Sequence, residues 1–151
     1  PPATSSAASD VYKRQSENLT HMSALGNDFI VIDAISHQCD VSKMIKNKLE
    51  ILKKDMPFDQ ILCLLPPRNI HCDVYLEIYN EDGSQSENCV NGLRCIGRYM
   101  HDHNLAFNEE ICVQLVNQIT KVKKIDEENY EVILEQFSLD PRGYWSGENQ
   151  K

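Results

Sequence analysis

The segment from Asn80 to Cys95 holds the densest set of chemically useful side chains, in the order NEDGSQSENCVNGLRC. A turn-forming run leads into Cys89, and an apolar pattern of helical period follows it directly. Cys89 is therefore predicted at a helix N-terminus, where free N–H groups and the helix dipole favour an anion. Two interpretations remain open: a thiolate that does chemistry, or a thiol that caps the helix or fills a gap.

An ordinary thiol has a pKa of about 8.5, so only a few per cent of it is ionised at neutral pH. The helix end, with Arg94 about one turn further on, predicts a Cys89 pKa lowered toward about 7 and a thiol suited to proton transfer. Cys95 lies further along the same helix and is predicted to be a core residue.

Hydrophobic periodicity predicts the elements that position this segment. Residues 72–79 alternate, which predicts a strand with one buried and one polar face. Residues 40–54 carry one apolar stripe, with Asp40 or Ser42 as the N-cap. The predicted strands are residues 29–32, 60–65, 72–79, 111–116, 121–125 and 130–135, and the predicted helices are residues 40–54 and 91–103. The fold class is therefore predicted to be α+β.

The composition limits the classes of function. The chain has 151 residues, of which 41% are hydrophobic, and a net charge of −8. This acidity argues against nucleic acid and against an anionic membrane surface as partners. The six cysteines would allow three disulfides, but a chain of this length can build a core without them. With no secretory signal pattern, reduced cysteines and a cytoplasmic location are predicted.

The domain organisation is predicted to be simple. Residues 1–16 are small, polar and without periodicity, and residues 10–15, DVYKRQ, resemble a translated sequencing adapter. They are predicted to be a disordered or artefactual leader, followed by a lobe at 17–136 and an irregular tail at 137–151. No metal site is predicted, since His101 and His103 alternate on a helix and Cys63, His71 and Cys72 lack zinc-ligand spacing.

Three motifs together resemble the diaminopimelate epimerase family. They are ALGNDFIVID at 24–33, Phe58-Asp59-Gln60, and Asn-x-Asp-Gly-Ser at 80–84 followed by Cys-x-Asn-Gly-x-Arg-Cys at 89–95. Their order and separations match those of the family's N-terminal lobe over residues 18–135. The resemblance implies a strongly curved, mostly antiparallel sheet wrapped around a central helix, with the second lobe absent.

The resemblance also implies a function. Family members interconvert LL- and meso-diaminopimelate, in lysine and peptidoglycan-precursor synthesis, without a cofactor. One cysteine thiolate removes the α-proton and a second cysteine returns one on the opposite face. Cys89 is implied as one of this pair. The implied substrate-binding residues are Asn27, Gln60, Asn80, Val90, Asn91 and Gly92, the last three through N–H groups that would hold the α-carboxylate.

Three departures from the family pattern stand out. Val90 replaces the usual glycine after the cysteine, which would be strained if that position needed a positive φ. Pro57 replaces a glycine before Phe58 and lacks a backbone donor. The family's second cysteine, in a Cys-Gly-Ser-Gly loop, has no counterpart after residue 136.

Three functional hypotheses follow. In the first, the chain is an inactive half of an epimerase, whose partners are diaminopimelate, the missing C-terminal lobe and, as in many relatives, a second copy of the enzyme. In the second, Val90 marks a racemase or isomerase that acts on another amino acid, such as histidine, or on another acid. In the third, the single lobe is a non-catalytic module that exposes the face its partner lobe would cover.

Overall fold

The computed structural model describes residues 19–55, 57–87 and 89–133, so the predicted leader and tail lie outside it. Eight strands and two helices make up this part of the chain. They are β1 (Leu19–Ala24), β2 (Asn27–Asp33), α2 (Val41–Asp55), β3 (Gln60–Leu65), β4 (Val74–Asn80), β5 (Gln85–Ser86), α3 (Val90–Asp102), β6 (Glu110–Gln114), β7 (Ile119–Lys124) and β8 (Tyr130–Ile133).

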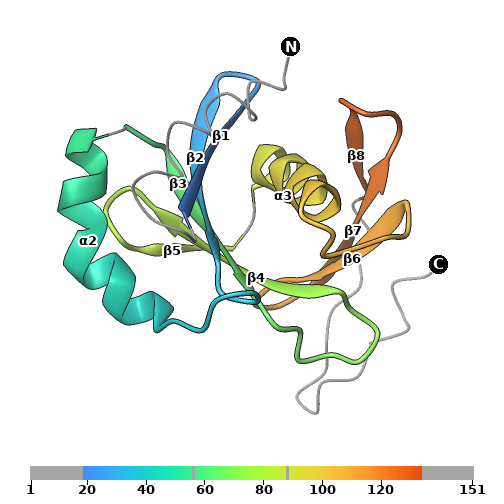
Figure 1. Cartoon of the computed structure of the whole chain (residues 1–151), viewed down its shortest axis with the longest axis horizontal. Coiled ribbons are helices and arrows are strands. Elements are labelled where there is room, and N and C mark those ends of the chain that lie inside the picture. The colour runs from blue at the N-terminus through green and yellow to red at the C-terminus, as the bar shows by residue number, and fades with distance from the viewer. Residues whose placement is uncertain (1–18, 56, 88, 134–151) are drawn as a thin grey trace.

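All the strands belong to one sheet with the order β1-β2-β3-β4-β6-β7-β8, and β5 pairs with β4. The pairs β2–β3 and β4–β6 are parallel, and the other pairs are antiparallel. The sheet curves around α3, while α2 lies on its outer side (Figure 1). Helix α3 contacts β1, β2, β7 and β8. The predicted α+β class, with a curved sheet around a central helix, is confirmed.

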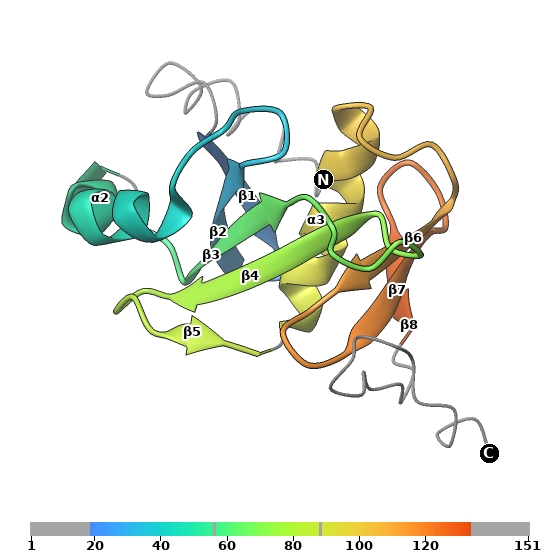
Figure 2. The ribbon, with the colours of Figure 1, turned by 90° about the horizontal axis from the view of Figure 1, so that it is seen from below.

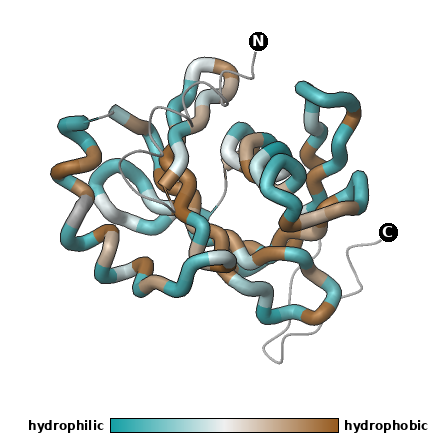
Figure 3. The backbone as a smooth tube through the Cα atoms, in the orientation of Figure 1, coloured by the Kyte–Doolittle hydropathy of each residue, from teal (hydrophilic) through white to brown (hydrophobic). Residues whose placement is uncertain are grey.

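Strands β2, β3 and β4 are buried on both faces because α3 covers one face and α2 the other. Alternate residues face α3 and form one core with the apolar stripe of that helix, and the intervening residues form a second core against α2. Figure 3 shows these strands as the most continuously hydrophobic part of the sheet. The inner residues include Phe29, Val31, Leu62, Leu64, Leu76 and Ile78, and the outer ones Ile30, Ile32, Ile61 and Cys63.

The outer face of β4 corrects one prediction. Its alternation predicted an exposed polar face, but Tyr75 is only 6% exposed, and Tyr79 packs against the core beneath α2. The aromatic bodies of tyrosines bury readily when the hydroxyl finds a partner, as Tyr79 does by donating to Glu77 Oε1 at 2.9 Å.

Both predicted helices form, and each end lies within one residue of the predicted position. The Asp40 side chain accepts a hydrogen bond from the Lys43 N–H at 3.1 Å, so Asp40 is the N-cap of α2. The helix ends at Asp55, just before Pro57. Helix α3 buries Leu93, Cys95 and Ile96, which confirms Cys95 as a core residue. No helix in the described ranges is long and apolar enough to cross a membrane.

Two strands were not predicted. The short β5 has no hydrophobic pattern, and β1 carries Thr20 and His21, both buried, within its apolar residues. A two-residue turn joins β1 to β2, with Leu25 at φ 52° and Gly26 at φ 86°. Positive φ values at both turn positions match the twist of the paired strands, so this turn sets the register in which Ala24 faces Asn27.

Gly97 allows α3 to approach the last hairpin closely. A Cβ there would lie 2.7 Å from Val122 Cγ1 and 2.8 Å from Tyr130 Cδ2. We expect Gly97→Ala to lower the free energy of unfolding by about 1–3 kcal/mol, because overpacking outweighs the gain in helix propensity. Urea denaturation checks this, with exposed Lys46→Ala as a control expected to stay within about 0.5 kcal/mol. Stability equal to or above that of the wild type would contradict the close packing.

Candidate active site

Three polar side chains lie where the inner apolar rows of neighbouring strands end. Asn27 begins β2, Gln60 begins β3 and Asn80 ends β4. Since β2 and β3 are parallel and β4 runs antiparallel to β3, these positions fall at the same end of the three strands. Strand alternation places each on the same face as the inner core residues, toward α3. The fold therefore brings Asn27, Gln60 and Asn80 to one end of the core.

Gln60 and Asn80 are opposite each other across β3 and β4, and their side chains are hydrogen-bonded. The Gln60 Nε2 group donates to Asn80 Oδ1 at 3.1 Å. A tight turn holds Asn80 in place, because its N–H donates to the Ser84 carbonyl at 2.7 Å and its Nδ2 group donates to Ser84 Oγ at 3.1 Å. The Asn-x-Asp-Gly-Ser motif is thus a turn that fixes one amide at the site.

Asn27 is joined to α3 through a chain of side chains. Arg94 Nη1 donates to Asn91 Oδ1 at 2.9 Å, and Asn91 Nδ2 donates to Asn27 Oδ1 at 2.9 Å. A guanidinium can only donate hydrogen bonds, so the Asn91 atom that faces it must be the oxygen. That choice turns the Asn91 amide nitrogen toward Asn27 and so fixes the orientation of both amides. Arg94 is therefore a positioning residue, a role beyond the positive charge predicted for it from the sequence.

Asp59 is a second residue whose role in the site was not predicted from the sequence. Its carboxylate accepts the Asp28 N–H at 2.8 Å, and its own N–H donates to the Asp28 carbonyl at 2.8 Å. These two bonds tie the start of β2 to the start of β3, which keeps Asn27 beside Gln60. Asp59 stands within the Phe58-Asp59-Gln60 motif, and that motif was the signal that could have revealed this role.

Cys89 is the N-cap of α3, in an extended conformation with φ −159° and ψ 102°. Its carbonyl accepts the first helical hydrogen bond, from Leu93 at 2.9 Å. The half-buried thiol lies over Gly92, where a Cβ would be 3.4 Å from the Cys89 sulfur and 3.0 Å from Leu62 Cδ2. Gly92 thus lets the first turn of α3 settle onto β3 and leaves room for the sulfur.

The prediction that the helix end lowers the Cys89 pKa is wrong in direction. Burial raises the pKa of this thiol, the N–H groups of Gly92 and Asn91 lower it in part, and the Asp59 carboxylate adds a small increase. The side chain makes no capping hydrogen bond to the helix, so those N–H groups compensate only partly for the loss of water. Within the chain described here, the Cys89 thiol form is therefore favoured over the thiolate.

Val90 is accommodated without strain. It is the first residue of α3 and half-buried, and the only non-glycine residues with positive φ in the described ranges are Leu25 and Asn104. A β-branched residue is tolerated at this position because its backbone is helical. Val90, Asn91 and Gly92 contribute the first N–H groups of the helix, which have no acceptor within it.

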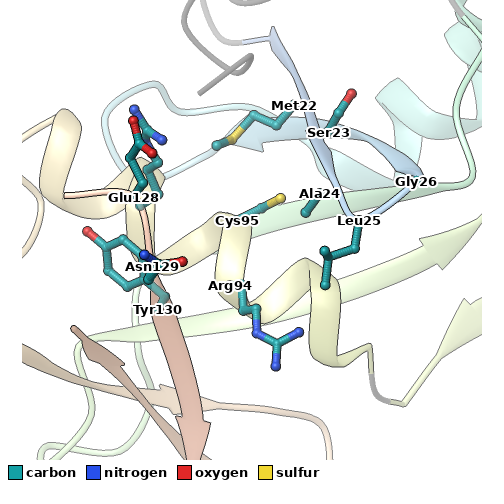
Figure 4. A pocket seen from close by; sticks show the side chains of 11 residues that line it. Met22, Ser23, Ala24, Leu25, Gly26, Arg94, Cys95, Glu128, Asn129 and Tyr130 are labelled. Atoms are coloured by element: carbon teal, nitrogen blue, oxygen red, sulfur yellow. The ribbon is translucent and has the colours of Figure 1, made fainter. Parts of the chain in front are cut away.

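A cavity of about 700 Å³ lies next to this site, between β1, α3 and the start of β8 (Figure 4). It is adjacent to the polar cluster but separate from it, since neither Cys89 nor any of the three amides at the strand ends lines it. The residues that line it are Met22, Ser23, Ala24, Leu25, Gly26, Arg94, Cys95, Arg98, Glu128, Asn129 and Tyr130.

Metal-ligating side chains do not gather anywhere in the described residues. No group of three or more His, Cys, Asp or Glu side chains there could hold a metal ion. His101 and His103 have separate partners: His101 Nδ1 is 2.8 Å from the Tyr130 hydroxyl, and His103 Nδ1 is 3.0 Å from the Tyr99 carbonyl.

A helix enclosed by a curved sheet, with a thiol at its N-cap and three strand-end amides beside it, defines an α+β lobe with one polar site. The family model described as diaminopimelate epimerase matches residues 19–136. The chain therefore belongs to the diaminopimelate epimerase family.

Individual relatives agree with this assignment. A diaminopimelate epimerase of Coxiella burnetii is 37% identical over 106 residues, which are 70% of this chain and 38% of the relative. One from Halorhodospira halophila is 33% identical over 122 residues, or 81% of this chain and 42% of the relative. The chain thus spans about 40% of the length of these relatives.

A solved structure shares the fold. The phenazine biosynthesis protein of the PhzF family from Bacillus anthracis matches with a TM-score of 0.53 at 11% identity, over 84% of this chain and 38% of that one. At this identity the likeness concerns the fold alone.

The state of Cys89 can be measured by alkylation. Because its pKa is raised, we expect the rate of iodoacetamide labelling to rise with pH to a midpoint above that of the same cysteine in the unfolded chain. At neutral pH the folded protein should carry less thiolate at Cys89 than the unfolded chain. Mass spectrometry of peptide 88–94, with and without guanidinium, reports this residue alone. A labelling midpoint in the folded chain equal to or below that in the unfolded chain would contradict the raised pKa of Cys89.

Proposed function

We propose that this chain is the N-terminal lobe of an amino-acid epimerase that interconverts LL- and meso-diaminopimelate by proton transfer at the α-carbon. The observation that carries the proposal is the position of Cys89 at the N-cap of α3, beside a fixed set of amides, in a chain of the diaminopimelate epimerase family. As in the family to which the chain belongs, the proposed reaction uses no cofactor and is a step of lysine and peptidoglycan-precursor synthesis. The proposed location is the cytoplasm.

The proposed substrate position follows from the donors at the site. The N–H groups of Val90, Asn91 and Gly92 would bind the substrate α-carboxylate, because an anion is stabilised at a helix N-terminus. Neutralising that carboxylate makes the neighbouring α-proton easier to remove. Asn27, Gln60 and Asn80 would contact the polar groups of a zwitterionic substrate, since amides both donate and accept hydrogen bonds.

Cys89 is proposed to exchange a proton with one face of the α-carbon. Its thiol form gives a proton to the carbanion, and its thiolate form removes one from the substrate. Burial favours the thiol, so in the lobe alone Cys89 is in the proton-donating state. A second cysteine on the opposite face would complete the inversion, and we propose that the C-terminal lobe supplies it. The chain by itself is then inactive in epimerisation.

A chimera tests this proposal. Residues 19–136 would be joined to the part of the Coxiella burnetii relative that follows its matched segment. We expect the chimera to incorporate deuterium at the α-carbon of LL-diaminopimelate in D₂O. Cys89→Ala should slow this exchange by at least about 100-fold, the usual contribution of one acid–base group. The half-buried Cys39→Ala is the matched control and should keep the activity.

Two results would contradict the proposal. One is a chimera that circular dichroism shows to be folded and that exchanges another amino acid but not diaminopimelate. The other is α-proton exchange at full rate by the 151-residue chain alone. Sequencing the gene past codon 151 is an independent check, because a continuing frame with a Cys-Gly-Ser-Gly loop is expected.

A further inference from the structure

Cys72 and Cys112 form a close pair at the end of β4 away from Cys89. Their sulfur atoms are 3.1 Å apart, closer than two sulfurs in ordinary van der Waals contact. A disulfide bond is about 2.05 Å long, so the thiols need to approach by only about 1 Å to form one. In the sequence, 40 positions separate the two cysteines, and only the tertiary structure brings them together.

The backbone holds the two segments side by side. The Asp73 N–H donates to the Cys112 carbonyl at 2.8 Å, and the Cys112 N–H donates to the Asp73 carboxylate at 2.8 Å. Val74 pairs with Val113, so Cys112 is in register with Asp73 and lies one residue diagonally from Cys72. With strands about 4.8 Å apart and about 3.3 Å per residue, such diagonal neighbours have Cα atoms about 5.8 Å apart, inside the range of about 4.4–6.8 Å that a disulfide accepts. The two hydrogen bonds keep the segments adjacent while the sulfurs close the remaining distance.

Cys72 and Cys112 lie beside the short β4–β6 pairing, which is the narrow seam of the sheet. Strands β4 and β6 pair only through Val74 with Val113 and Tyr75 with Gln114, yet this pairing connects β1–β4 to β6–β8. Figure 2 shows β6 beside one end of β4 and β5 beside the other. A bond between Cys72 and Cys112 would close a loop that contains Cys89 and all of α3.

We propose that Cys72 and Cys112 are an oxidisable pair that forms an intramolecular disulfide with a peroxide as the oxidant. In the first step, the Cys72 thiolate attacks one peroxide oxygen, gives Cys72 sulfenic acid and releases hydroxide. In the second, the Cys112 sulfur attacks the sulfenic sulfur, the S–S bond forms and water leaves. Two thiols are oxidised, and one hydrogen peroxide is reduced to two waters.

The two thiols differ in a way that suits these steps. A hydrogen bond from the Cys112 thiol lowers the pKa of Cys72, and the same interaction, with burial, raises the pKa of Cys112. Cys72 is thus the thiol that ionises first and attacks the oxidant, and Cys112 is the resolving thiol. Cys72 is itself buried, as Cys63 and Cys95 are. Burial raises the pKa of Cys63 and of Cys95, whereas the pKa of Cys72 is lowered, so those two compete poorly for the oxidant.

Peptide mapping of the full 151-residue chain tests the proposal. The chain is reduced, freed of reductant, treated with one equivalent of hydrogen peroxide and alkylated. Trypsin with glutamyl endopeptidase separates the relevant cysteines, into peptides 69–77, 88–94 and 111–121. We expect peptides 69–77 and 111–121 to be linked with the loss of two hydrogens, while peptide 88–94 stays alkylated. A linkage of Cys72 or Cys112 to another cysteine, or no linkage at all, would overturn the proposal.

Thermal unfolding gives a second measurement. Closing this loop should raise the Tm of the oxidised chain by roughly 5–15 °C, and dithiothreitol should reverse the rise. Cys112→Ser should abolish the rise, and Cys39→Ser should leave it unchanged as the matched control. An equal rise in Cys112→Ser would overturn the proposal. If Cys112→Ser does not fold, the peptide map of the wild-type chain still decides between the outcomes.

Discussion

The contact of the first turn of α3 with strand β3 determines the arrangement of the site. Gly92 lies against Leu62, and a Cβ at this position would be only 3.0 Å from Leu62 Cδ2. This close approach places the helix N-terminus at the end of the sheet where β2 and β3 begin and β4 finishes. Cys89, the free N–H groups of the first helical turn and the strand-end amides are near one another because the helix sits so close to the sheet.

The same packing determines the chemistry of the thiol. A helix N-terminus favours a thiolate when the sulfur keeps its water, but the contact that positions Cys89 also removes part of that water. The balance raises the pKa of Cys89. Arg94 does not offset this loss through a contact of its own, because its guanidinium binds the Asn91 oxygen and orients a chain of amides. Position and protonation state thus follow from one packing interaction.

The sheet has a wide hydrophobic interior, but its two halves are connected by a short pairing of strands β4 and β6. Strands β2, β3 and β4 are covered on both faces, whereas β4 and β6 share only two paired positions. The two halves of the sheet are also held by α3, which packs against β1 and β2 on one side and β7 and β8 on the other. Gly97 permits that second contact, and Cys72 and Cys112 lie at the narrow seam itself.

The sequence alone determined six of the eight described strands, both described helices and the polar residues at the strand ends. The apolar run at 60–65, the alternation of 72–79, the helical stripe of 91–103 and the motif at 89–95 predicted the α+β lobe and Cys89 at a helix start, because such patterns depend on local geometry. Only the tertiary structure decided the rest. Burial of Cys89, the roles of Asp59 and Arg94, and the meeting of Cys72 with Cys112 depend on contacts between distant segments, which no local pattern encodes.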